Sequence, residues 1–97
     1  MQTIAFLGKK SDIIHVREDL IGAEILFEEF SSEGFDGVTI STLIVDLASA
    51  LAPPIAAVLA AKVATKKQVT VKVNGVEVNA NTEKEAMNMI KELSEKE

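Results

Sequence analysis

A valine-rich segment with an Asn-Gly pair at its centre constrains the fold more than any other feature. Residues 68–80 read QVTVKVNGVEVNA, and Asn74 and Gly75 both tolerate the positive φ angles of a two-residue type I′ turn. The turn predicts a β-hairpin whose register gathers the valines on one face and sets Lys72 opposite Glu77 on the other. Such a hairpin needs another element to cover its valine face.

The segment after the hairpin carries the signals of a helix start. Thr82 and Glu85 have capping-box spacing, and Glu83 adds a second acidic residue in the first turn, where the helix dipole favours anions. The apolar residues that follow recur at helical spacing, namely Ala86, Met87, Met89, Ile90 and Leu93. We expect this helix to pack on the valine face of the hairpin.

The N-terminal third is less clearly patterned. Residues 2–8 form a short apolar run that predicts a strand, closed by a turn at Gly8. Ser11 or Asp12 could cap a short helix, or residues 12–16 could return as a second strand. Residues 24–30 favour a strand over a helix, and turn-forming residues follow them.

Residues 38–64 are nearly all apolar and rich in alanine, which favours a helix. Thr39 or Ser41 could cap its start. Pro53 and Pro54 must interrupt it, so we expect a kinked helix or two helices, the second with proline in its first turn.

These elements predict one α+β domain over residues 1–97. A small antiparallel sheet of three to four strands would include the C-terminal hairpin and pack against the long proline-kinked helical segment and the C-terminal helix. A chain of 97 residues, 47% apolar, can bury one core but not two. Its core would be aliphatic, because the chain has no Trp or Tyr.

Charge and composition exclude several classes of partner. Fifteen acidic and ten basic residues give a formal charge of −5, which repels phosphate backbones, so we expect no nucleic-acid partner. The absence of cysteine excludes disulfides and fits a reducing compartment. The basic residues follow the first apolar run, the reverse of a secretory signal, so we expect the chain to be cytoplasmic.

The sequence offers little for catalysis. His15 is the single histidine, and an ordinary surface histidine is a simpler interpretation than a general base or a pH sensor. Gly8, Lys9 and Lys10 lack the spacing of a phosphate-binding loop. We therefore predict no enzyme activity, no catalytic residues and no cofactor.

An acidic cluster offers a second kind of site, because carboxylate oxygens bind calcium and magnesium. It lacks the ligand pattern of an EF-hand loop, so a solvated acidic face is favoured and no metal site is predicted. A protein that binds a small molecule or a divalent cation through the loop 28–36 stays as the alternative function. The cluster comprises Glu24, Glu28, Glu29, Glu33 and Asp36.

The long apolar segment exceeds the needs of a small core. Residues 42–61 have about the length of a membrane span, roughly 20 residues, but Asp46, the prolines and the many alanines argue against insertion. Membrane contact stays as a further alternative. We predict instead that one helical face contacts a protein partner or a second copy, through Leu43, Leu47, Leu51, Ile55, Leu59 and Val63.

The C-terminal two-thirds resembles the effector-associated constant component family of bacterial conflict systems. The shared pattern is an alanine- and leucine-rich stretch (LIVDLASALAPPIAAVLAAKVA), a short basic junction (KK), a valine hairpin and an acidic-capped helix, within residues 37–93. The resemblance implies an adaptor or scaffold role in a multi-component immune system. With the residues, it predicts a non-enzymatic interaction module that self-associates as a homo-oligomer.

Overall fold

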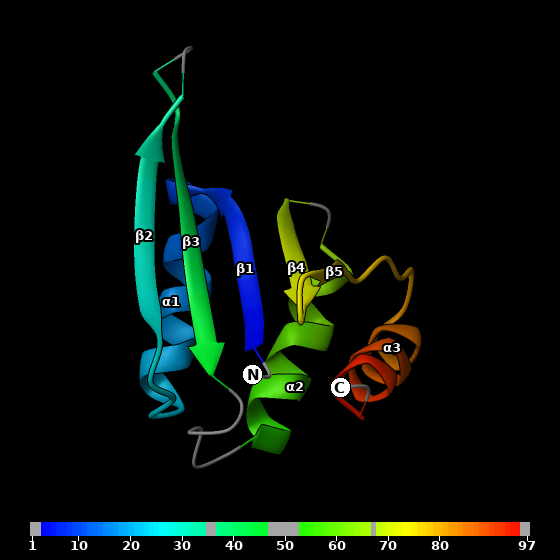
Figure 1. Ribbon diagram of the computed structural model, residues 1–97. Coiled ribbons are helices and arrows are strands. Elements are labelled where there is room, and N and C mark those ends of the chain that lie inside the picture. The colour runs from blue at the N-terminus through cyan, green and yellow to red at the C-terminus, as the bar shows by residue number, and fades with distance from the viewer. Residues whose placement is uncertain (1–2, 35–36, 47–52, 67, 96–97) are drawn as a thin grey trace.

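The computed structural model describes residues 3–34, 37–46, 53–66 and 68–95. Strands and helices follow one another in an order that interleaves the two types (Figure 1). Within the described residues they are β1 (Thr3–Lys9), α1 (Lys10–Gly22), β2 (Glu28–Glu33), β3 (Thr39–Asp46), α2 (Pro53–Ala64), β4 (Val69–Val73), β5 (Val76–Glu77) and α3 (Glu83–Glu95).

The strands form one antiparallel sheet in the order β2-β3-β1-β4-β5. The first six elements have the βαββαβ connectivity and strand order of a ferredoxin-like fold, to which β5 and α3 are added. The predicted α+β class is therefore confirmed, with five strands in the described sheet where three to four were expected. Folds of this kind carry many unrelated functions, so the topology alone names none.

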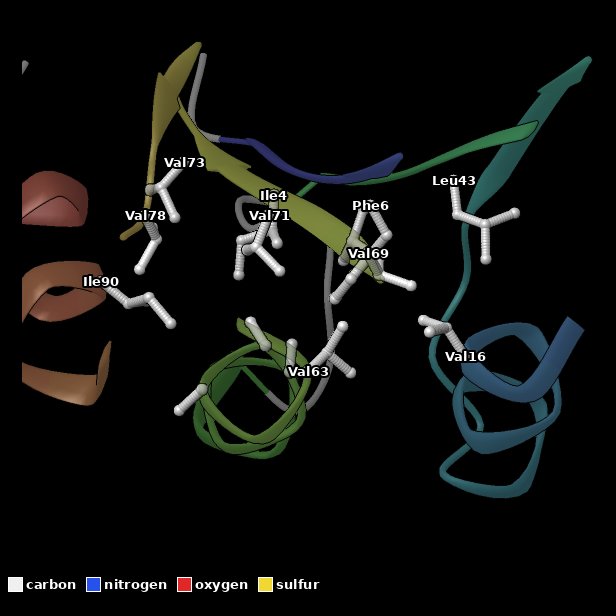
Figure 2. Packing of buried hydrophobic residues seen from close by; sticks show 14 of the residues in the cluster. Ile4, Phe6, Val16, Leu43, Val63, Val69, Val71, Val73, Val78 and Ile90 are labelled. Atoms are coloured by element: carbon white, nitrogen blue, oxygen red, sulfur yellow. The ribbon is translucent and has the colours of Figure 1, made fainter. Parts of the chain in front are cut away.

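The described helices all lie on one side of the sheet. Figure 2 shows Val16 of α1, Val63 of α2 and Ile90 of α3 pointing toward the strands, whose own apolar side chains point back at them. Ile4, Phe6, Leu43 and Val73 are fully buried in this layer. In Figure 1 these helices stand behind or beside the sheet, and no described element lies in front of it.

The N-terminal strand is confirmed as β1, which extends through Gly8 to Lys9 in place of the expected turn. Of the two alternatives for the next segment, the helix forms as α1, without a side-chain hydrogen bond at its N-cap. The strand expected over residues 24–30 begins later, as β2 at Glu28. The delay arises because α1 runs on to Gly22 and the connection turns at Glu24, which has φ of 58°.

The prediction of helix throughout residues 38–64 is wrong in its first part. Residues 39–46 form β3, and Ser41 lies in the middle of this strand, so neither Thr39 nor Ser41 caps a helix. The reason is local: TISTLIVD is rich in β-branched residues, whose restricted side chains favour strands, whereas the alanines come later. The described helix α2 has Pro53 and Pro54 in its first turn, as expected of a second helix.

The C-terminal hairpin and helix form as predicted. Asn74 and Gly75 have φ of 52° and 83°, and Lys72 pairs with Glu77. The Glu85 amide donates to Thr82 Oγ1 over 3.2 Å, which confirms the helix cap. Asn74 also ties the hairpin to its surroundings, since its Oδ1 accepts from the Thr3 amide over 2.9 Å and its Nδ2 donates to the Leu93 carbonyl over 3.1 Å.

Gly75→Ala is expected to lower the free energy of unfolding by about 1–2 kcal/mol, because an L side chain is strained at positive φ. Space is not the cause, since nothing lies within 4 Å of the position where Cβ would stand. Gly75→Asn is the control, because asparagine tolerates this region despite its larger side chain. Urea unfolding of both variants checks the prediction, and equal losses would contradict a conformational origin.

Candidate functional site

The predicted contact residues do not form one exposed face. Leu43 is fully buried on β3, Val63 is buried on α2, and Leu59 is partly buried against the core. Leu43 and Val63 fill the space between sheet and helices, so they are unavailable to a partner. The other three predicted positions fall outside the described residues or side chains: Leu47, Leu51 and Ile55.

The structure instead leaves apolar side chains on the sheet face opposite the helices, which we call the open face. Strand alternation determines its members: along β1 and β3, every second residue points into the core and those between point away. Phe30 is 54% exposed and Ile40 39% exposed, and three further members are partly buried. The apolar members are Ala5, Leu7, Phe30, Ile40 and Ile44.

Polar and charged residues surround this patch. The pairing registers place Thr42 and Thr70 within the open face, and Glu28 and Lys72 toward its two sides. Glu28 lies on edge strand β2, opposite Ile44, while Lys72 lies on β4, opposite Ala5. An apolar centre with a charged border is the usual composition of a protein-protein contact surface.

The single histidine lies on α1, on the helix side of the sheet. His15 is exposed and lines a small cavity of about 100 Å³ together with Asp12, Asp19 and Lys66. Within the described parts of the chain, no three His, Asp or Glu side chains are arranged to hold a metal ion. The cavity has room for a few water molecules, and its lining contains no Ser, Thr or Cys beside the imidazole.

The acidic residues of β2 are divided between the two faces of the sheet. Glu28 lies on the open face, whereas Glu29 lies on the helix side, where its Oε1 is 3.6 Å from Arg17 Nε. Glu33 shares the side of Glu29, and Asp36 lies outside the described residues. Alternation along the strand thus separates carboxylates that a shared cation would need on one side.

A larger cavity of about 420 Å³ opens between the start of β4 and the segment that follows β5. Thr70, Glu77, Asn79 and Asn81 supply its polar lining, and Val69 and Val78 belong to its apolar part. The volume falls in the range of small-molecule sites. The cavity contains a single carboxylate and no cationic side chain.

Sequence reasoning missed the residues of the open face, although a signal for them exists. Strand β1 reads TIAFLGK and β3 reads TISTLIVD, so apolar residues occupy both alternating sets of positions. This pattern is typical of strands that are covered on both faces. In β3 this pattern joins the apolar, alanine-rich run that follows, and the whole run, residues 38–64, favours a helix in the sequence.

None of the helices among the described residues is long and apolar enough to cross a membrane. Comparison with protein-family models, with curated proteins and with solved structures found no match to this chain. The argument for function therefore rests on the shape and chemistry of the surface.

Proposed function

We propose that this protein is a non-enzymatic interaction module that associates with a second copy of itself through the open face. One observation carries the proposal: the central strands β1 and β3 are apolar on both faces, but the described helices cover only one. A second sheet packed on the open face would supply the missing cover, as in a β-sandwich.

The apolar side chains of the open face provide the driving force. Phe30 on β2 and Ile40 on β3 expose much of their surface. Ile44 on β3 and Leu7 on β1 add partly buried apolar surface to the same face. Burial of apolar surface contributes about 25 cal/mol per Å², so covering a phenylalanine and three aliphatic side chains on each copy would favour association. Contiguous apolar surface of this kind commonly marks an interaction site.

A second copy suits the open face because that face contains both an acidic and a basic residue, which can pair between two copies. Glu28 and Lys72 lie on opposite sides of the apolar patch, so an inverted copy could set a base against each acid. The adaptor role implied by the family resemblance is part of this proposal, since a self-associating module can bring other components together.

Phe30→Lys is expected to convert a wild-type dimer into a folded monomer, because the substitution places a charge among the apolar side chains of the contact. The measurement is size-exclusion chromatography with light scattering, with circular dichroism to confirm folding. Ile21→Lys is the matched control: Ile21 is 57% exposed on α1, close to the 54% of Phe30, but lies outside the open face. This control should remain dimeric.

Val58→Lys tests the rival surface on the outer side of α2, where Val58 is 43% exposed. It should also remain dimeric. A dimer that resists Phe30→Lys but dissociates with Val58→Lys would place the contact on α2 and contradict the proposal. A wild-type protein that stays monomeric at high concentration would overturn self-association.

A further inference from the structure

The strand registers arrange the open face in rows that run across the sheet. One row contains Glu28 on β2, Ile44 on β3, Ala5 on β1 and Lys72 on β4. Their chain neighbours Leu43, Val45, Ile4, Phe6, Val71 and Val73 point into the core, so the row points away from it. Glu28 and Lys72 therefore lie on opposite sides of two apolar residues, and Glu77 of β5 follows Lys72 at the edge of the sheet.

The adjacent row has a similar composition without charge. It contains Phe30 on β2, Thr42 on β3, Leu7 on β1 and Thr70 on β4. In both rows, the midpoint of the four strands falls between β3 and β1.

We propose that two copies pack open face to open face about a two-fold axis that runs parallel to the strands, between β1 and β3. This inference rests on the proposed self-association and specifies its geometry. The axis exchanges β3 with β1 and β2 with β4, so Glu28 of each copy meets Lys72 of the other. Ile44 then lies over Ala5, Phe30 over Thr70, and Leu7 over Thr42.

Two other positions of the two-fold axis bring like charges together. A two-fold axis perpendicular to the strands could pass through the row that contains Glu28 and Lys72. It would set Glu28 over Glu28 and Lys72 over Lys72. An axis along β1 would exchange β2 with β5 and set Glu28 over Glu77, the cross-strand neighbour of Lys72. Like charges in direct opposition are destabilising, which favours the axis between β1 and β3.

The charged side chains are long enough for this arrangement. Strands are spaced by about 4.8 Å, so Glu28 and Lys72 each lie about 7 Å from the axis on opposite sides. Packed sheets cross at about 30°, which displaces facing residues at that distance by about 4 Å along the strands. Sheets pack about 10 Å apart, a gap that a glutamate and a lysine can bridge together.

Charge reversal at either position tests the geometry. A Glu28→Lys homodimer would oppose two lysines at both contacts, and a Lys72→Glu homodimer would oppose two glutamates. Each variant alone is expected to dimerise roughly tenfold more weakly than wild type, or worse. An equimolar mixture should recover wild-type affinity, because the heterodimer has opposite charges at both contacts.

Analytical ultracentrifugation over a concentration series measures the dissociation constants. The control mixture pairs Lys72→Glu with Glu33→Lys, which makes the same charge change on β2 but on the helix side of the sheet. Glu33→Lys should dimerise with itself as wild type does, because its Glu28 and Lys72 are intact. Lys72→Glu should not join it at wild-type affinity, because their heterodimer keeps one contact between like charges.

The outcomes separate the two proposals. If wild type dimerises and Phe30→Lys dissociates it, but the first mixture recovers no affinity, the two-fold geometry is wrong and the contact surface stands. Recovery in both mixtures would also overturn the geometry, because it would show that overall charge governs association. A monomeric wild type would remove the proposed function itself.

Discussion

Leu43→Ala is expected to lower the free energy of unfolding by about 2–5 kcal/mol. Leu43 is fully buried on β3 and lies among the core side chains that point toward the helices (Figure 2). Replacing its isobutyl group by a methyl group leaves a cavity that close-packed neighbours fill only in part. Urea unfolding followed by circular dichroism, at one fixed protein concentration, measures the loss.

Leu26→Ala is the matched control, because Leu26 is the same residue type but 79% exposed in the connection before β2. It should change stability by less than about 0.5 kcal/mol. The comparison also separates two interpretations of Leu43. If Leu43→Ala leaves the fold stable but dissociates a dimer, Leu43 belongs to the contact surface that the sequence predicted, and its assignment to the core is wrong.

Local chemistry explains which elements could be predicted from the sequence. The Asn74-Gly75 turn and the Thr82 cap depend on residues that are close together in the chain. Their backbone preferences and hydrogen bonds are therefore visible without knowledge of the fold. The same holds for Pro53 and Pro54, which form the first turn of α2.

Strand β3 could not be assigned in the same way, because its pattern has no useful period. Ile40 and Ile44 are apolar on the open face, and Leu43 and Val45 are apolar on the core face. Alternation is lost when both faces are apolar, and a short run of this kind cannot be distinguished from a buried helix by periodicity. The alanines that follow then favoured helix for the whole segment.

The candidate site depends still more on tertiary structure. Ala5, Phe30 and Ile44 come from three strands, and Glu28 and Lys72 share a row only because β3 and β1 lie between β2 and β4. Nothing in the sequence sets these inter-strand registers by itself. A prediction of self-association could therefore be made from excess apolar surface, but its location could not.

Gly8→Ala is expected to lower the free energy of unfolding by about 1–3 kcal/mol, because adding even one methyl group overpacks this position. A Cβ at Gly8 would stand 3.1 Å from the Gln68 carbonyl oxygen and 3.5 Å from Val69 Cγ2. Gly8 pairs with Val69 between β1 and β4, so the Gln68 backbone cannot withdraw without disturbing the central ladder. The glycine therefore serves close packing of the sheet.

Gly22→Ala is the control, and its effect should have the opposite sign. Gly22 is the last residue of α1, and nothing lies within 4 Å of its Cβ position. Alanine there should stabilise the protein by about 0.4–1 kcal/mol, since it reduces the freedom of the unfolded chain without a clash. Urea unfolding of both variants measures the difference. If Gly8→Ala were stabilising as well, Gln68 and its neighbours would have room to move, and the start of β4 would be less firmly held against β1 than its pairing indicates.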